Sequence, residues 1–262
     1  MNKQTKAIDA RGRHLGGETP LLCTPLVGRT RKRVLEEASR VIPQEPDMIA
    51  WRADFFEQIG DTKAVIETAE RLRSLAGALP IIFTCRSVKE GGEPIAIGED
   101  KVVDLYADVS ASRLVDFIDF EMDNDAAHVR RVRESTRSNE VRLLLSYHNY
   151  SYTPGLEFLV QRFLEAERRG ADVALVAVMP RDRMDVLTLL TATAQADEKT
   201  HIPLVSMSMG PLGSVTRMIG GLFGSGVSFA VGESASAPGQ IPIGDLVTVH
   251  DIIRRAHGGE IF

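Results

Sequence analysis

The chain has 262 residues, of which 44% are hydrophobic and 26% charged, so it can bury a sizeable core beneath a polar surface. Its net charge of -5 argues against nucleic acid or an acidic membrane as a partner, and its one dense basic stretch, residues 29–33, is typical of a first helical turn. The sequence shows no membrane-spanning run and no secretory signal, which predicts a cytoplasmic protein.

Apolar runs and helix-like stretches alternate along the chain. Residues 1–20, with Gly16 and Gly17, predict a small hairpin before the first strand. Eight apolar runs then predict strands at 21–27, 48–54, 80–86, 117–123, 142–148, 173–179, 202–208 and 227–232. Helical spacing between them is clearest at 62–77, 156–170 and 185–196, while 213–226 predicts a small helix and turn.

Strands that alternate with helices imply parallel pairing with right-handed crossovers. Eight such units predict an α/β fold of the closed (β/α)8 TIM-barrel type, with the N-terminal hairpin of residues 1–20 closing the bottom. The sequence has no linker, so we expect one domain over residues 1–262. Barrel active sites lie at the carboxyl ends of the strands, which directs attention to those positions.

Polar side chains and methionines gather at the predicted strand ends. They are Arg52, Asp54, Arg86, Lys89, Glu90, Glu121, Tyr147, His148, Met179, Met207 and Met209. Two connections, 87–94 and 232–242, are rich in Gly, Ser and Pro, which favours mobile lids over packed turns.

His148 is the candidate general acid or base, because imidazole titrates near neutral pH. The alternative is a hydrogen-bonded structural histidine. Arg52, Arg86 and Arg217 lie near the same rim, and converging guanidinium groups indicate a small anionic, oxygen-rich ligand. The alternative for Arg52 is pairing with a neighbouring carboxylate such as Asp54 or Glu121.

The sequence indicates no metal and no cofactor. The six histidines have no metal-ligand spacing, and no glycine-rich stretch matches a nucleotide-binding pattern. Cys23 and Cys85 both lie in apolar runs, so we expect buried reduced thiols.

Five blocks in order carry a family resemblance: FTCRSVKEGGEP, LSYHNYSYTP, VAVMP, SMSMGPLGSVTR and SASAPGQIP. Over about residues 7–256 the chain resembles the type I 3-dehydroquinate dehydratases, or dehydroquinases. The resemblance implies a lyase of the shikimate pathway of aromatic amino acid biosynthesis, or of quinate metabolism. In that family a lysine forms an imine with the ketone of 3-dehydroquinate and a histidine moves the proton. It also implies a homodimer, since family members are often dimers.

The resemblance also implies roles for individual residues. His148 holds the place of the catalytic histidine, and Arg217 matches the arginine that binds the substrate carboxylate. The other positions that match substrate-site or lid residues of the family are Arg52, Arg86, Met207, Ser236 and Gln240.

Four positions depart from the family pattern. Leu175 stands where the family has its Schiff-base lysine, so an imine cannot form there. Ala50 replaces a glutamate that binds ring hydroxyls, and Asn149 follows the histidine where an acidic residue usually orients the imidazole. Glu233 stands in the last lid where a lysine is common.

Three hypotheses follow from this pattern. The first is a dehydratase-like lyase that acts without a Schiff base on 3-dehydroquinate or a related cyclic polyhydroxy keto acid, with His148 as the acid and base. The second is an inactive relative that binds a pathway metabolite as a sensor or partner protein. The third is ordinary dehydroquinase activity through another nucleophile such as Lys89.

Overall fold

A curled parallel sheet forms the centre of the molecule. The computed structural model describes residues 6–17 and 19–256, so residues 1–5 and 18 of the predicted N-terminal extension lie outside the described part. Nine strands pair in the order β11-β10-β3-β4-β5-β6-β7-β8-β9. They are β3 (Leu21–Leu26), β4 (Met48–Arg52), β5 (Ile81–Thr84), β6 (Phe117–Glu121), β7 (Arg142–Asn149), β8 (Val173–Val178), β9 (Leu204–Ser208), β10 (Val227–Val231) and β11 (Ile241–Pro242).

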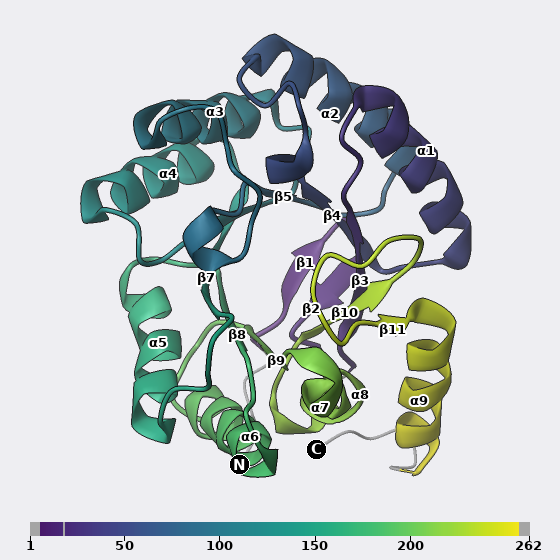
Figure 1. Ribbon diagram of the computed structural model, residues 1–262, viewed down its shortest axis with the longest axis vertical. Coiled ribbons are helices and arrows are strands. Elements are labelled where there is room, and N and C mark those ends of the chain that lie inside the picture. Colours follow the sequence, from purple (N-terminus) through teal and green to yellow (C-terminus); the bar gives the residue numbers. More distant parts are fainter. Residues whose placement is uncertain (1–5, 18, 257–262) are drawn as a thin grey trace.

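Helices surround this sheet on its outer side (Figure 1). The longer ones are α1 (Arg31–Val41), α2 (Thr62–Ala76), α3 (Glu99–Ser112), α4 (Ala126–Ser138), α5 (Leu156–Arg168), α6 (Arg183–Asp197) and α9 (Ile243–Ala256). The short ones are α7 (Gly210–Gly213), α8 (Val215–Ile219), η1 (Ile42–Gln44), η2 (Ala53–Phe55), η3 (Val88–Glu90) and η4 (Gly220–Phe223). None of the described helices is long and apolar enough to cross a bilayer.

The two ends of the sheet meet, which closes the ring. A parallel bridge joins Leu204 of β9 to Ser225, two residues before β10, and the Gly226 amide donates to the Leu204 carbonyl at 2.7 Å. The barrel prediction is therefore confirmed. Each predicted strand begins within two residues of an observed one, since a buried parallel strand carries a continuous apolar signal.

Aromatic side chains fill the space between the sheet and its helices. Trp51 packs edge to face on Phe56 and Phe83, and the chain of contacts continues through Tyr106 to Phe120. Each such pair contributes about 0.5–1.5 kcal/mol beyond the burial of apolar area. These contacts fix β4, β5 and β6 against α3, and hence the positions of the strand ends that face the site.

A second apolar cluster fills the inside of the barrel at the amino ends of the strands. It includes Met48, Phe117 and Leu144, together with Leu15 of the N-terminal hairpin. The hairpin, β1 (Ile8–Ala10) and β2 (Arg13–Leu15), is antiparallel and closes this end, as predicted. The barrel interior is therefore solid at this end and polar at the other.

The hairpin turn is not where the glycine pair suggests. It falls on Arg11 and Gly12, which have φ of 53° and 83°, the two positive values of a type I′ turn. An arginine at such a position gives no sequence signal, because non-glycine residues rarely adopt positive φ. Gly16, at φ 84°, follows β2 instead, and a Cβ there would come within 3.0 Å of the Pro203 ring.

Candidate active site

A pocket lined by both charged and apolar side chains opens at the carboxyl ends of the strands. It has a cavity volume of about 50 Å³. Its walls come from strands β3 to β10 and from the connection between β10 and β11. The lining residues are Pro25, Ala50, Arg52, Thr84, Arg86, Asp119, His148, Tyr150, Leu175, Ala177, Met207, Met209, Phe229, Ala237 and Gln240.

Strand alternation brings these side chains together. Successive side chains of a strand point to opposite faces, so every second residue faces the barrel interior. Leu175 is paired in register with Ser146 of β7 on one side and with Val205 of β9 on the other. It therefore lies about halfway along the strands of the barrel. His148 pairs with Ala177 one layer nearer the opening. Of the predicted site residues, Arg52, Arg86, His148, Met207 and Gln240 line this pocket, and Arg217 and Ser236 contact residues that line it. Lys89, Glu121 and Tyr147 do not line it.

His148 is held by Glu90. The Nδ1 atom of the imidazole lies 2.9 Å from Glu90 Oε2, and the His148 backbone amide donates to the same oxygen at 3.0 Å. This contact occupies Nδ1 and leaves Nε2 as the ring nitrogen available to a ligand.

Burial controls the protonation of this pair. It lowers the pKa of His148 well below 6.5, an effect that the charges of Arg86 and Arg52 reinforce. Burial also raises the pKa of Glu90 to about 8. Near neutral pH the imidazole is therefore uncharged, the form that can accept a proton.

Asn149, which stands where the family usually has an acidic residue, makes no hydrogen bond to the imidazole among the described residues. Its Oδ1 accepts from the amides of Ser151 and Tyr152, and its Nδ2 donates to the Tyr147 hydroxyl. These bonds fix the turn after β7. The orienting role falls to Glu90, which is remote from His148 in sequence.

The segment 87–94 is a packed connection and not a loose lid, contrary to the prediction. The Ser87 amide donates to Glu121 Oε1 at 2.6 Å, and the Glu93 amide donates to Asp54 Oδ2 at 3.2 Å. A Cβ on Gly91, at φ 82°, would lie 2.4 Å from the ring of Tyr150. Glycine at this position lets Tyr150 reach the pocket wall and keeps Glu90 in place.

Arg86 lies among three carboxylates, those of Glu90, Asp119 and Glu121. It lies 2.5 Å from Asp119 Oδ2 and donates to Ser146 Oγ at 2.8 Å. Its contacts to Glu90 and Glu121 are both longer, at 3.4 Å. Burial opposes ionisation, but the three carboxylates outweigh it and raise the pKa of Arg86. Arg86 is therefore a structural centre of the site as well as a pocket residue.

Arg52 forms an ion pair with Asp54, one of the two carboxylates that the alternative interpretation of Arg52 named. Its Nε and Nη2 contact the two oxygens of Asp54 at 2.8 and 2.7 Å. Its Nη1 still donates to the Ser236 carbonyl at 3.4 Å, and the guanidinium lies over the Phe55 ring. The pairing fixes the fork in a position facing the pocket.

Arg217 has no carboxylate partner among the described residues. The side chain is 2% exposed, and its guanidinium donates to the carbonyls of Gly239, Phe229 and Pro238 and contacts Met207 Sδ. Burial lowers its pKa to about 10, which still leaves it charged at neutral pH. A buried cation without a counter-ion is unfavourable by itself and favours an anionic ligand nearby.

The connection 232–240 covers the pocket from above. The Ser236 amide donates to Gln240 Oε1 at 2.8 Å, and Gln240 lines the cavity. Gly239 has φ 76°, and a Cβ there would come within 2.1 Å of the Gly210 carbonyl. This close approach requires glycine and brings the lid backbone onto Arg217.

Glu233 lies outside the pocket, at the base of this lid. Its Oε1 contacts Arg33 Nη2 at 2.5 Å and Arg40 Nη1 at 2.6 Å, both from α1. The hydrogen bond from Arg33 lowers the pKa of Glu233 below its usual range. The residue therefore ties the lid to α1 and does not reach toward a ligand.

No lysine lines this cavity among the described residues. Leu175 is 2% exposed and forms part of its wall, next to Met207 and Ala177. Lys89 faces away, with its side chain 84% exposed and its Nζ 3.6 Å from Glu99. The described residues also contain no group of three or more His, Cys, Asp or Glu suited to a metal ion. Cys23 and Cys85 are free and buried.

The sequence analysis did not identify Asp119 and Tyr150 as lining residues, nor Glu90 as the partner of His148. The other lining residues that it did not name are Pro25, Thr84, Ala177, Phe229 and Ala237. Inward alternation along 117–121 was the available signal for Asp119. The sequence analysis listed Glu90 among the residues at the strand ends, but the sequence did not predict its contact with His148. Met207 and Met209 face the same side, as alternation predicts, and both line the pocket.

The fold and the pocket define a β/α-barrel protein with a pocket at the carboxyl ends of its strands. The family pattern described as Type I 3-dehydroquinase matches residues 22–257. A 3-dehydroquinate dehydratase of Albidiferax ferrireducens is 53% identical over 257 residues, which cover 98% of this chain and 97% of that protein. The chain belongs to the type I 3-dehydroquinase family.

Solved structures agree in fold. The crystal structure of the 3-dehydroquinate dehydratase from Geobacillus kaustophilus matches with a TM-score of 0.94 and 45% identity, covering 95% of this chain and 96% of that one. A type I 3-dehydroquinate dehydratase from Clostridium difficile matches with a TM-score of 0.92 and 34% identity, covering 95% and 98%.

Proposed function

We propose that the chain is a dehydratase that acts without a Schiff base on 3-dehydroquinate or a related cyclic polyhydroxy keto acid. The observation that carries the proposal is Arg217, a buried guanidinium that has no carboxylate partner among the described residues and contacts pocket-lining Met207. A substrate carboxylate would supply the missing counter-charge. Family membership supports the reaction class.

His148 acts as the base in this proposal. Its uncharged Nε2 removes the proton on the carbon next to the ketone, and the electron pair moves onto the ketone oxygen as an enolate. The hydroxyl on the next carbon then leaves as water, taking the proton from His148, while the enolate electrons form the new double bond. The contact of Nδ1 with Glu90 supports the role, because it orients the ring throughout both transfers.

Arginine side chains stabilise the enolate oxygen. Arg52 and Arg86 both line the pocket, and a preorganised cation in a dry site is worth more than one in water. They replace in part the positive charge that an imine would supply. The barrier without an imine is higher by several kcal/mol, and each ~1.4 kcal/mol lowers the rate tenfold. We therefore expect slow turnover.

The proposal is tested by incubating the purified protein with 3-dehydroquinate and following the enone absorbance of the product, beside the Geobacillus kaustophilus dehydratase. We expect a rate at least about a hundredfold lower than that of the relative, and no rate for His148→Ala. Binding by thermal shift should persist in His148→Ala, since a site-specific ligand raises the melting temperature.

Two results would overturn the proposal. A rate equal to that of the relative contradicts the missing covalent step. Binding of 3-dehydroquinate with no enone at all favours the second hypothesis, in which the chain only binds a metabolite.

A further inference from the structure

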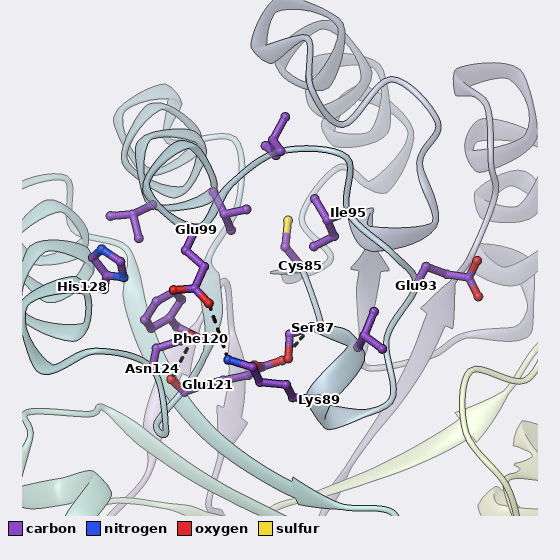
Figure 2. Close-up of a pocket in the computed structure, with 14 residues that line it drawn as sticks. Cys85, Ser87, Lys89, Glu93, Ile95, Glu99, Phe120, Glu121, Asn124 and His128 are labelled. Carbon is purple, nitrogen blue, oxygen red and sulfur yellow. Dashed lines mark hydrogen bonds and ion pairs between the residues drawn. The ribbon is translucent and has the colours of Figure 1, made fainter.

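A second cavity lies beside the active site, on the outer side of β5 and β6. Its volume of about 200 Å³ is larger than that of the His148 pocket. The segment 87–97 and helix α3 enclose it, together with Asn124 and His128 near the start of α4 (Figure 2). The proposed reaction does not use this cavity, because neither His148 nor Arg217 lines it.

Most of this cavity is apolar. Its walls include Phe120, Ile95 and Ile97, with Val102 and Val103 from α3. Its size suits a compact organic group, since an apolar protein cavity of roughly 150 Å³ is known to hold one benzene molecule. The cavity volume therefore suits a ligand of the size of one six-membered ring with a short substituent.

The inner wall of the cavity is polar. Glu121 is only 6% exposed, and its Oε1 accepts from the Ser87 amide at 2.6 Å. Ser87 Oγ is buried with no hydrogen-bond partner, which is unusual because buried polar atoms are almost always paired. The Ser87 oxygen is closed off from the cavity, so Glu121 is the charged acceptor that this wall offers a ligand.

Charge at this wall favours a cation. Arg86 is shared by three carboxylates and lies closest to Asp119, so Glu121 receives only a contact at 3.4 Å. Burial raises the pKa of Glu121, as expected for a carboxylate with too little counter-charge. At the cavity's exposed edge, Lys89 is already paired with Glu99, so it leaves no free cation there.

We propose that this cavity binds a small primary amine with a compact apolar body, its ammonium group at the Glu121 carboxylate. The apolar part contacts Phe120 and Val102. An ammonium group is a charged hydrogen-bond donor, which matches a carboxylate acceptor.

Occupancy of this cavity is coupled to His148. The segment that begins at Ser87 lines the cavity and continues into Glu90, whose carboxylate holds the imidazole. Arg86 joins Glu121 to Glu90 from the other side. A ligand that changes the position of Glu121 therefore changes the environment of His148, and this holds whether or not the proposed reaction occurs.

The test is a titration with benzylamine by isothermal calorimetry, with benzyl alcohol as the uncharged probe. We expect one benzylamine per chain and affinity for benzyl alcohol weaker by about tenfold or more, because a charge-assisted hydrogen bond is lost. Val102→Trp and, as a second variant, Ile97→Trp fill the cavity and should each weaken benzylamine binding by at least about tenfold. The matched control is Val247→Trp on α9, whose side chain is already exposed.

The imidazole signal of His148, assigned in NMR spectra by its loss in His148→Gln, should shift as benzylamine is added. His148→Ala should still bind one benzylamine per chain, so failure of the dehydratase proposal leaves this result intact. Equal binding by Val102→Trp, equal affinity for benzyl alcohol, or an unchanged His148 signal would each overturn the proposal.

Discussion

Leu175 lies at mid-barrel height with Ser146 and Val205 as its strand neighbours, and it carries no group that can react with a ketone. Its place in the pocket wall followed from the sequence, because strand alternation and the ungapped family motifs both position it. The partner of His148 did not follow. Glu90 comes from a different connection, in which Gly91 lies close to Tyr150, and its carboxyl group reaches the ring.

Restoring a lysine tests the role of Leu175. We expect Leu175→Lys to form a covalent adduct with 3-dehydroquinate that borohydride traps, and to form enone at least about a hundredfold faster than the unmodified chain. Burial lowers the pKa of such a lysine and increases its nucleophilic fraction. Intact-mass spectrometry detects the adduct.

Leu175→Met is the matched control, since it keeps the size and the apolar character without the amine. An adduct in the methionine variant, or none in the lysine variant, would show that position 175 is not where the ketone binds.

Arg217 makes the second prediction at this scale. Arg217→Ala should weaken binding of 3-dehydroquinate by roughly 10- to 100-fold, the value of a hydrogen bond to a charged group. Arg217→Lys keeps the charge but loses the planar guanidinium group. Its affinity for 3-dehydroquinate should therefore lie between that of the unmodified chain and that of Arg217→Ala. Thermal shift against ligand concentration measures both; an unchanged affinity in Arg217→Ala would remove the carboxylate assignment.

At the scale of elements, the strands were predictable and the connections were not. Eight apolar runs identified eight strands, because a buried parallel strand needs apolar side chains on both faces. The hairpin turn and the packing of 87–94 depend on Arg11 at positive φ and on contacts with Asp54 and Glu121. Neither feature leaves a local pattern in the sequence.

The lid gives a prediction of its own. Glu233→Ala removes the contacts with Arg33 and Arg40 and should weaken ligand binding by up to about thirtyfold, since two partly exposed ion pairs contribute about 0.2–1 kcal/mol each. The effect should shrink at high salt, because exposed charges are screened.

Glu36→Ala is the control for the lid, because Glu36 lies near Arg33 on α1 but makes no contact with residues 232–240. Equal losses of affinity in the two variants would mean that the charge of α1, and not the tie to the lid, is responsible.

At the scale of the whole molecule, the barrel combines an apolar end with a charged one. The hairpin and the inner cluster close the amino end, while Arg86 and its carboxylates fill the other. The barrel class was predictable from the alternation of elements. The buried network was not, since it joins Arg86, which follows β5, to side chains of β6, β7 and η3 that strand pairing and the connection 87–94 bring together.

This network makes stability depend on pH. Burial raises the pKa of Glu90 from 4.5 to about 8, so in that range the folded state binds a proton that the unfolded state has released. The free energy of unfolding therefore falls as pH rises. Below pH 6.5 the unfolded state protonates His148 while the folded state does not, because the pKa of His148 is lowered in the folded state. In that range His148 makes the free energy of unfolding rise with pH, which offsets the fall caused by Glu90.

The net decline should appear between pH 6.5 and 8 and amount to at most about 2 kcal/mol. Urea unfolding at several pH values measures it. Glu90→Gln removes the titrating group and should flatten the curve; an equally steep decline in the variant would assign the effect to another residue.

The absence of a Schiff base is tested most directly by borohydride treatment in the presence of 3-dehydroquinate. The measurement is the rate of enone formation before and after the treatment. An imine-forming enzyme loses its activity in this treatment, because its lysine is alkylated. We predict a slow rate that His148→Ala abolishes and that borohydride leaves unchanged once the reagent is removed. Loss of the rate after treatment, with a covalent gain in mass, would contradict the account.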